Sequence, residues 1–146
     1  MTKNTKKEIL LNVAVLIVVA MIIGYYFFNK GPLDVRSQDG IVATPTELYT
    51  YYITDSMKAH KKFDDKVIRI KGEVSEVTEN TQKKQVVIFK TASSGGNINC
   101  TMEEAIPGIK KGDVVEIKGI CNGLGQGDPD LGIMGDVYLT RSFISK

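Results

Sequence analysis

Two short stretches of the chain repeat one pattern, in which apolar and charged residues alternate around a glycine. The first, KVIRIKGEV, begins at Lys66, and the second, DVVEIKGIC, begins at Asp113. Alternation with a period of two predicts strands that bury one face. A glycine in the middle of a long strand permits the bend that a small closed barrel requires. The repeat therefore predicts two bent strands of one barrel, hinged at Gly72 and Gly119.

The first of these strands contains an irregularity. Its apolar positions change parity between Val74 and Val77, which predicts a bulge near Ser75. Three more strands follow from similar patterns, at residues 85–90 (QVVIFK), 97–102 (NINCTM) and 137–144 (VYLTRSFI).

A helix is expected ahead of the strands. Thr44 can cap it, Pro45 suits the first helical position, and Glu47 completes a capping box with Thr44. Its apolar residues then fall roughly along one face, so the helix is amphipathic. One helix and five strands predict a mainly β fold, the five-stranded Greek-key barrel called the OB-fold. Its first and fourth strands are neighbours, so the repeated pattern needs no gene duplication.

The N-terminal part of the chain has a different character. Residues 9–28, ILLNVAVLIVVAMIIGYYFF, carry no charge and are long enough to cross a bilayer as a helix. Lys3, Lys6 and Lys7 precede them, so the positive-inside rule predicts a cytoplasmic N-terminus. A cleaved signal peptide begins in the same way, but the apolar run exceeds the usual length and no small-x-small cleavage site follows it. An uncleaved anchor is therefore favoured.

This interpretation places the chain in the inner membrane, crossing it once, with its C-terminal domain outside the cytoplasm. The expected parts are a cytoplasmic N-terminus at residues 1–8, a transmembrane helix at 9–28, a linker at 29–43, and the barrel with its leading helix at 44–146. The formal charge is +3 over the first thirty residues and −1 over the rest, which together give the net +2 of the chain. A domain so close to neutral lacks the basic surface that binding to phosphate backbones usually requires.

Several segments together resemble one known family. TPTELY, KVIRIKGEV, NINCTMEE, KKGDVVEIKGICNG and GDVYLTRS occur in the order seen in the tRNA_anti-like family of bacterial OB-fold proteins. The resemblance runs from Thr44 to the end of the chain. That family is named for its similarity to an anticodon-binding barrel, so the resemblance implies the same fold and nucleic-acid binding.

The chain has two cysteines, Cys100 and Cys121, both at inward positions of expected strands. They lie in the part expected outside the cytoplasm, where oxidising conditions permit a disulfide. A bridge and a pair of buried thiols are both compatible with this pattern. Members of the resembling family often carry a third cysteine in the last strand, where this chain has Ser142, so the resemblance implies that Cys121 has lost that partner.

No catalytic, metal or cofactor motif is found in the sequence. His60 is the sole histidine and lies in the polar stretch KAHKKF, where we expect it to be solvated. No serine lies in a GxSxG motif, and the glycine-rich stretch from Asn122 has neither the GxGxxG nor the calcium-loop pattern. We therefore predict a protein that is not an enzyme and that binds no metal and no cofactor.

An OB-fold binds its ligands across its second and third strands and the loops that join strands one to two and four to five. The residues on these segments with suitable side chains are Lys84, Phe89, Lys90, Asn97, Asn99, Thr101, Asp128 and Asp130. Phe89 is the one ring on the two strands, which is few for stacking bases. The uncharged row of Asn97, Asn99 and Thr101 suits hydrogen bonds to a sugar or a peptide backbone, although an ordinary solvated face carries the same residues.

Two functional hypotheses follow. The first is a membrane-anchored, non-catalytic module that binds a protein, peptide or glycan partner in the cell envelope, and a scaffold role in a larger envelope complex is a variant of it. The second is a nucleic-acid-binding OB domain, which the family name and Lys83, Lys84 and Lys90 support. Topology separates the two, because a domain outside the cytoplasm rarely meets RNA.

Overall fold

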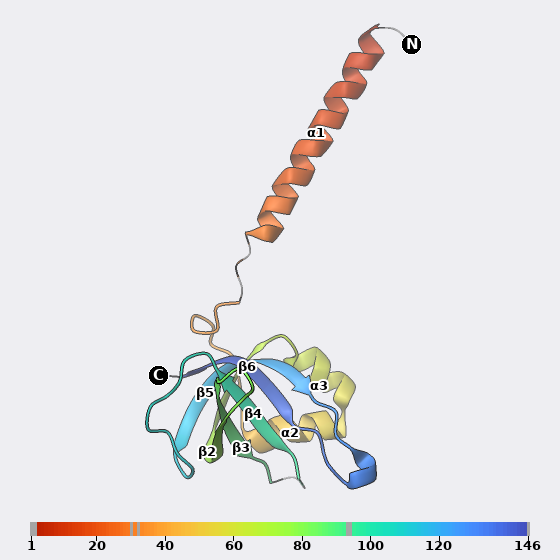
Figure 1. Cartoon of the computed structure of the whole chain (residues 1–146). Coiled ribbons are helices and arrows are strands. Elements are labelled where there is room, and N and C mark those ends of the chain that lie inside the picture. Colours follow the sequence, from red (N-terminus) through yellow and green to blue (C-terminus); the bar gives the residue numbers. More distant parts are fainter. Residues whose placement is uncertain (1–2, 30, 32, 93–94, 146) are drawn as a thin grey trace. The chain divides into compact units, whose positions relative to one another are not determined.

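The computed structural model describes residues 3–29, 31, 33–92 and 95–145, and contacts within the chain divide it into two units, Met1–Asp34 and Val35–Lys146. The first unit contains helix α1 (Lys3–Phe28), drawn in red and orange in Figure 1. Its segment Thr5–Phe28 contains 18 consecutive residues with a mean hydropathy of 2.5 and is long enough to cross a membrane, a criterion that an N-terminal signal sequence also meets. Residues 9–28 thus lie in a helix of the expected length and composition.

The second unit is built around a closed barrel of five strands. These are β2 (Val67–Glu79), β3 (Gln85–Lys90), β4 (Asn97–Met102), β5 (Val114–Leu124) and β6 (Val137–Ile144). Their order is β2-β3-β4-β6-β5, and β5 pairs back with β2 to close the sheet. All neighbours are antiparallel except β4 and β6, which are parallel. This is the OB-fold order, with the last strand between the third and the fourth, so the predicted fold class is confirmed.

A short additional strand, β1 (Ile41–Ala43), runs parallel to the start of β2, with Ile41 paired to Ile68. It belongs to a segment that was expected to be a linker. From Val35 onward this segment is packed on the barrel, because Val35 is only 1% exposed and the Lys118 ammonium donates to the carbonyls of Arg36 and Gln38 at 3.3 and 2.9 Å. The barrel unit therefore begins near Val35 rather than at residue 44.

The two repeated stretches pair with each other, as β2 and β5, with Gly119 opposite Ile68 and Gly72 opposite Val115. Each glycine lies where another element comes close. A Cβ atom on Gly119 would lie 2.3 Å from the Ser142 hydroxyl of β6, and one on Gly72 would lie 2.9 Å from Pro45. The lack of a side chain at these two glycines thus allows β6 and the start of α2 to pack closely against β5 and β2. This role is separate from the strand bending that the sequence suggested. The expected bulge is confirmed, because the pairing of β2 with β3 shifts between Val74 and Glu76.

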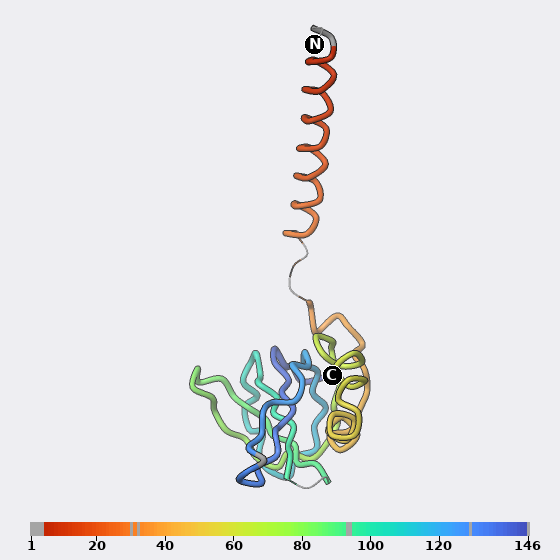
Figure 2. Tube along the Cα trace, turned by 90° about the vertical axis from the view of Figure 1, so that its right-hand side faces the viewer, coloured from red at the N-terminus to blue at the C-terminus, as the bar shows by residue number. Residues whose placement is uncertain are grey.

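The leading helical segment consists of two helices, α2 (Pro45–Thr54) and α3 (Ser56–Phe63), where one was expected. Asp55 separates them: its backbone ends α2 and its carboxylate accepts from the Lys58 N–H at 3.1 Å, which caps α3. Figures 1 and 2 show both helices on one side of the barrel. Their buried residues complete the core and are Leu48, Tyr49, Tyr52, Ala59 and Phe63. Every core residue in the described part of the chain belongs to the barrel unit, so this unit has the means to fold without α1.

The predicted capping box is present at the start of α2. The Thr44 hydroxyl accepts from the Glu47 N–H at 3.2 Å, and the Glu47 carboxylate accepts from the Thr44 N–H at 2.9 Å. Thr44→Ala removes the first bond and is expected to lower the free energy of unfolding by about 1 kcal/mol, measured by urea denaturation of the barrel unit. Thr54→Ala, at the exposed end of the same helix, serves as the matched control and should change stability by less than about 0.5 kcal/mol.

The contribution of the Glu47 carboxylate to the capping box should depend on pH. The hydrogen bond from the Thr44 backbone N–H, followed by one from its side chain, lowers the pKa of Glu47, so this contribution is present above the unfolded-state pKa and is lost as the pH falls through the folded-state value. Glu47→Ala should therefore cost less stability in acid than at neutral pH. An equal cost at neutral and acidic pH would contradict this account.

Candidate ligand-binding face and groove

A polar row runs along the outer surface of β4, between β3 and β6. Asn97, Asn99 and Thr101 alternate with the buried Ile98, Cys100 and Met102 and are each partly exposed. Across the sheet, Asn99 lies opposite Ile88 of β3 on one side and Tyr138 of β6 on the other. Tyr138 is 43% exposed, so its ring borders the row. We call the surface formed by Asn97, Asn99, Thr101, Asp136 and Tyr138 the polar face.

Asp136 fixes the two amides of this face. Its carboxylate accepts from the backbone N–H of Asn97 at 2.8 Å, from the side-chain amide of Asn97 at 3.4 Å, and from that of Asn99 at 2.9 Å. The amide oxygen of Asn99 is buried and has no hydrogen-bond partner among the described residues. Burial, together with the nearby charge of Asp136, also raises the pKa of Tyr49. The amide groups are thus held in one orientation before any ligand arrives.

The glycine-rich loop between β5 and β6 borders the polar face and is held by its own backbone. The Gly125 N–H donates to the carbonyl of Asp136 at 2.7 Å, and the Tyr49 hydroxyl donates to the carbonyl of Gly135 at 3.0 Å. A Cβ atom on Gly135 would lie 2.0 Å from the Gly125 carbonyl oxygen, so two backbone segments cross here at a distance that only glycine allows. These hydrogen bonds hold the loop backbone beside the polar face in one conformation.

Phe89, the one ring expected on this surface, is not there. Its side chain is 0% exposed and points into the core, so the expectation that it contacts a ligand is wrong. The two lysines behave differently from each other: Lys84 forms an ion pair with Glu103 at 3.1 Å, whereas Lys90 is exposed beside Asn97. The ring and the carboxylate that do belong to the face, Tyr138 and Asp136, were not selected from the sequence.

Of the three acidic residues of the glycine-rich loop, Asp136 belongs to the polar face, whereas Asp128 and Asp130, which the sequence suggested, form no described hydrogen bond with that face. The Asp128 carboxylate accepts from the backbone N–H groups of Asp130 and Leu131, at 3.1 and 3.3 Å, so it shapes the turn. Asp130 is exposed. Among the residues that the structure describes, no group of three or more potential ligands could hold a metal ion.

The two cysteines enter the core, as expected, and both are free. Cys100 and Cys121 both pair with Leu139, one from each side, so a whole strand lies between them. Two strand spacings amount to roughly 10 Å, whereas a disulfide needs Cα atoms within about 7 Å. The bridge that the sequence left open is therefore absent, and burial raises the pKa of both thiols.

This arrangement makes a prediction about thiol labelling. The folded protein should resist a maleimide reagent, because both sulfurs are buried and protonated. After denaturation without a reductant, two thiols per chain should be modified, as counted by mass spectrometry. Recovery of unmodified protein after denaturation would show that a bridge forms and that the strands around Leu139 are arranged differently.

Cys121 also belongs to a series of hydrogen bonds under the helices that runs from the core to the surface. Its sulfur lies 3.2 Å from the Tyr52 hydroxyl, which donates to one oxygen of Asp64. The other oxygen of Asp64 lies 2.6 Å from Nδ1 of His60. His60, which was expected to be solvated, is thus half-exposed and bonded. This series of hydrogen bonds connects α2 and α3 to β5, and the Cys121 thiol at its inner end is 0% exposed.

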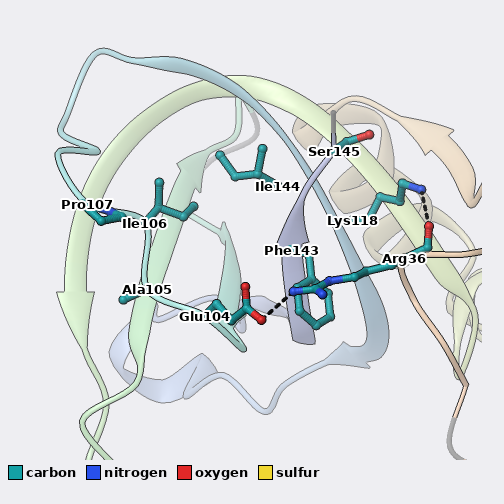
Figure 3. A pocket seen from close by; sticks show the side chains of 9 residues that line it. All are labelled: Arg36, Glu104, Ala105, Ile106, Pro107, Lys118, Phe143, Ile144 and Ser145. Carbon is teal, nitrogen blue, oxygen red and sulfur yellow. Dashed lines mark hydrogen bonds and ion pairs between the residues drawn. The ribbon is translucent and has the colours of Figure 1, made fainter.

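A groove lies at the other end of β6, shown in Figure 3. It has a volume of about 690 Å³ and is lined by Arg36, Glu104, Ala105, Ile106, Pro107, Lys118, Phe143, Ile144 and Ser145. The Arg36 guanidinium lies over the Phe143 ring, 4.3 Å from its centroid, and pairs with Glu104. We call this feature the β6 groove. No local sequence pattern marks this groove, because its lining comes from four separate segments of the chain.

The fold and the polar face together define an OB-fold module. The tRNA_anti-like family model matches residues 1–131, so the chain belongs to the tRNA_anti-like family. Strand β6 lies beyond the matched residues, although it completes the barrel.

Comparisons with individual proteins add little to this assignment. No curated protein matches the chain. A crystal structure described as an aspartyl-tRNA synthetase from Leishmania major Friedlin is similar over 76% of the chain, with 10% sequence identity and a TM-score of 0.42. The chain spans 22% of the length of that protein.

Proposed function

We propose that the protein is a membrane-anchored, non-catalytic OB-fold module that binds a protein, peptide or glycan partner in the cell envelope. Among these partners the polar face favours a glycan. The observation that supports this choice is Asp136, which holds the amides of Asn97 and Asn99 in place beside the exposed ring of Tyr138. Fixed amides can bond sugar hydroxyls, an aromatic ring can stack on a sugar, and this surface of OB-folds is used for oligosaccharides in other proteins.

Asp136→Ala tests this role. The variant removes three hydrogen bonds and frees both amides, so binding to oligosaccharides immobilised on an array should fall about tenfold or more. Asp130→Ala, in the exposed part of the same loop, is the matched control and should bind like the wild type. A barrel unit that binds no glycan, or whose binding is unchanged by Asp136→Ala, would contradict the proposal.

A second candidate ligand is single-stranded nucleic acid. The family assignment supports it, together with the exposed ring of Tyr138 and the neighbouring Lys90. Fluorescence anisotropy of the barrel unit with labelled oligonucleotides at low salt would test it. Binding that weakens steeply with salt and is lost in Tyr138→Ala would favour this candidate, whereas no binding at micromolar protein would exclude it.

The orientation of the anchor is part of the proposal. Three lysines, Lys3, Lys6 and Lys7, precede the apolar residues of the helix. This charge supports a cytoplasmic N-terminus and a barrel unit on the opposite side of the membrane. Alkaline phosphatase fused to the C-terminus should then be active, and a fused green fluorescent protein exported through the same route should be dark. The opposite pair of results would place the barrel in the cytoplasm. The mass of the membrane-bound chain would show whether residues 9–28 are retained.

A further inference from the structure

We infer that the β6 groove binds a short extended peptide segment that carries a carboxylate next to an apolar side chain. The Arg36–Glu104 ion pair spans the groove until the carboxylate of the peptide replaces that of Glu104. This site shares strand β6 with the polar face but no residue, so the inference goes beyond the proposed function.

The first support is the open edge of β6. Strand β4 pairs with β6 as far as Met102 and Ser142, and the Glu103 N–H still donates to the Ser142 carbonyl at 2.9 Å, after which residues 104–107 line the groove. Strand β6 continues to Ile144, where it is paired only with β5 among the described residues. One edge of its last residues therefore faces the groove. An extended peptide can pair with such an edge through main-chain hydrogen bonds.

The second support is the apolar lining. The lining includes Ile106 of the β4–β5 loop and Ile144 of β6, both drawn in Figure 3. Ile144 is 39% exposed, and Pro107 and Phe143 extend the same lining. This surface can accept one apolar side chain of a peptide laid along β6, in the way that alternate side chains of an added strand fill pockets.

The third support is charge. The groove contains two cations, Arg36 and Lys118, and one carboxylate, Glu104, among its described residues. The Lys118 ammonium is held by two backbone carbonyls, and no described carboxylate lies within ion-pair distance of it, so its charge is not neutralised locally. The cations favour an acidic ligand over a neutral or basic one.

The fourth support is the exposure of the ion pair that spans the groove. The side chains of Arg36 and Glu104 are 57% and 71% exposed. An ion pair in this setting is weak, so exchanging its carboxylate for another one costs little. Arg36 is meanwhile positioned by its contact with the Phe143 ring and does not depend on Glu104 for its place.

The test uses the barrel unit labelled with ¹⁵N and two synthetic peptides. One is acetyl-Ser-Val-Leu-Asp-Val-Ser-amide, and the other has Asn in place of Asp. The Asp peptide should shift the amide signals of residues 104–106, 118 and 143–145, and the Asn peptide should bind at least about threefold more weakly. Glu104→Gln should tighten binding of the Asp peptide about threefold, because it removes the competing carboxylate, and Arg36→Gln should weaken it about tenfold.

Glu79→Gln, at the exposed end of β2, is the control for loss of a surface carboxylate and should leave the affinity unchanged. Three results would overturn the inference: no shifts at about 5 mM peptide, equal binding of the Asp and Asn peptides, or unchanged affinity in Glu104→Gln. Because the polar face lies elsewhere, failure of Asp136→Ala to alter glycan binding would not affect this result.

Discussion

Replacing Phe89 by alanine is expected to destabilise the barrel unit by about 4 kcal/mol. The ring is 0% exposed and packs in the core. Phe89 pairs with Ile98 of β4, and its ring lies next to Gly72 of β2. Removing it leaves a cavity at the centre of a small core, and such changes usually cost about 3 to 5 kcal/mol. The measurement is urea denaturation of the wild type and the variant, with unfolding monitored by circular dichroism.

The informative comparison is Tyr138→Ala, which removes the ring that is exposed on the polar face. It should cost about 1 kcal/mol or less, because much of that ring remains in water. It should instead reduce ligand binding. If Phe89→Ala left stability intact and abolished binding, the ring would be a contact of the ligand and the burial of β3 described above would be incorrect.

The second large effect is expected for Gly119→Ala, which should cost about 2 to 3 kcal/mol. The new Cβ atom would lie 2.3 Å from the Ser142 hydroxyl and 3.1 Å from Cβ of Leu139, so the Ser142 side chain must rotate within the core or β5 and β6 must move apart. Thermal unfolding of the barrel unit would show the loss as a lower midpoint.

A double variant makes this prediction specific. The Ser142 hydroxyl is buried without a hydrogen-bond partner among the described residues, so Ser142→Ala alone should be neutral or stabilising. Because it also removes the closest atom, Gly119→Ala with Ser142→Ala should recover most of the stability lost in Gly119→Ala. An additive loss in the double variant would mean that the clash with Ser142 is not the cause.

The fold could be predicted because its signals are local. The start of α2 depends on residues within one turn of helix, and the bulge near Ser75 follows from a change of parity in a single strand. Strands β3, β4 and β6 begin and end at the predicted residues because polar turns separate them. The break between α2 and α3 was not predicted. Asp55 ends one helix and caps the next, and this double role can be recognised only once the backbone conformation is known.

The candidate site could be predicted only in part. The alternation in β4 correctly placed Asn97, Asn99 and Thr101 on the outside. In β3, four apolar residues follow one another, so the pattern did not say which face holds Phe89. The role of Asp136 depends on the parallel pairing of β4 with β6, which joins residues far apart in the sequence, and no local pattern records that pairing.

The position of β6 also has a consequence for how the chain is made. Because this strand fills the space between β4 and β5, a nascent chain that ends before Val137 has both of these edges unpaired. Unpaired edges are templates for aggregation, and a sheet closed by distant segments forms slowly. We therefore expect the barrel to fold after its synthesis is complete, and C-terminally truncated chains to need protection by chaperones or to be degraded.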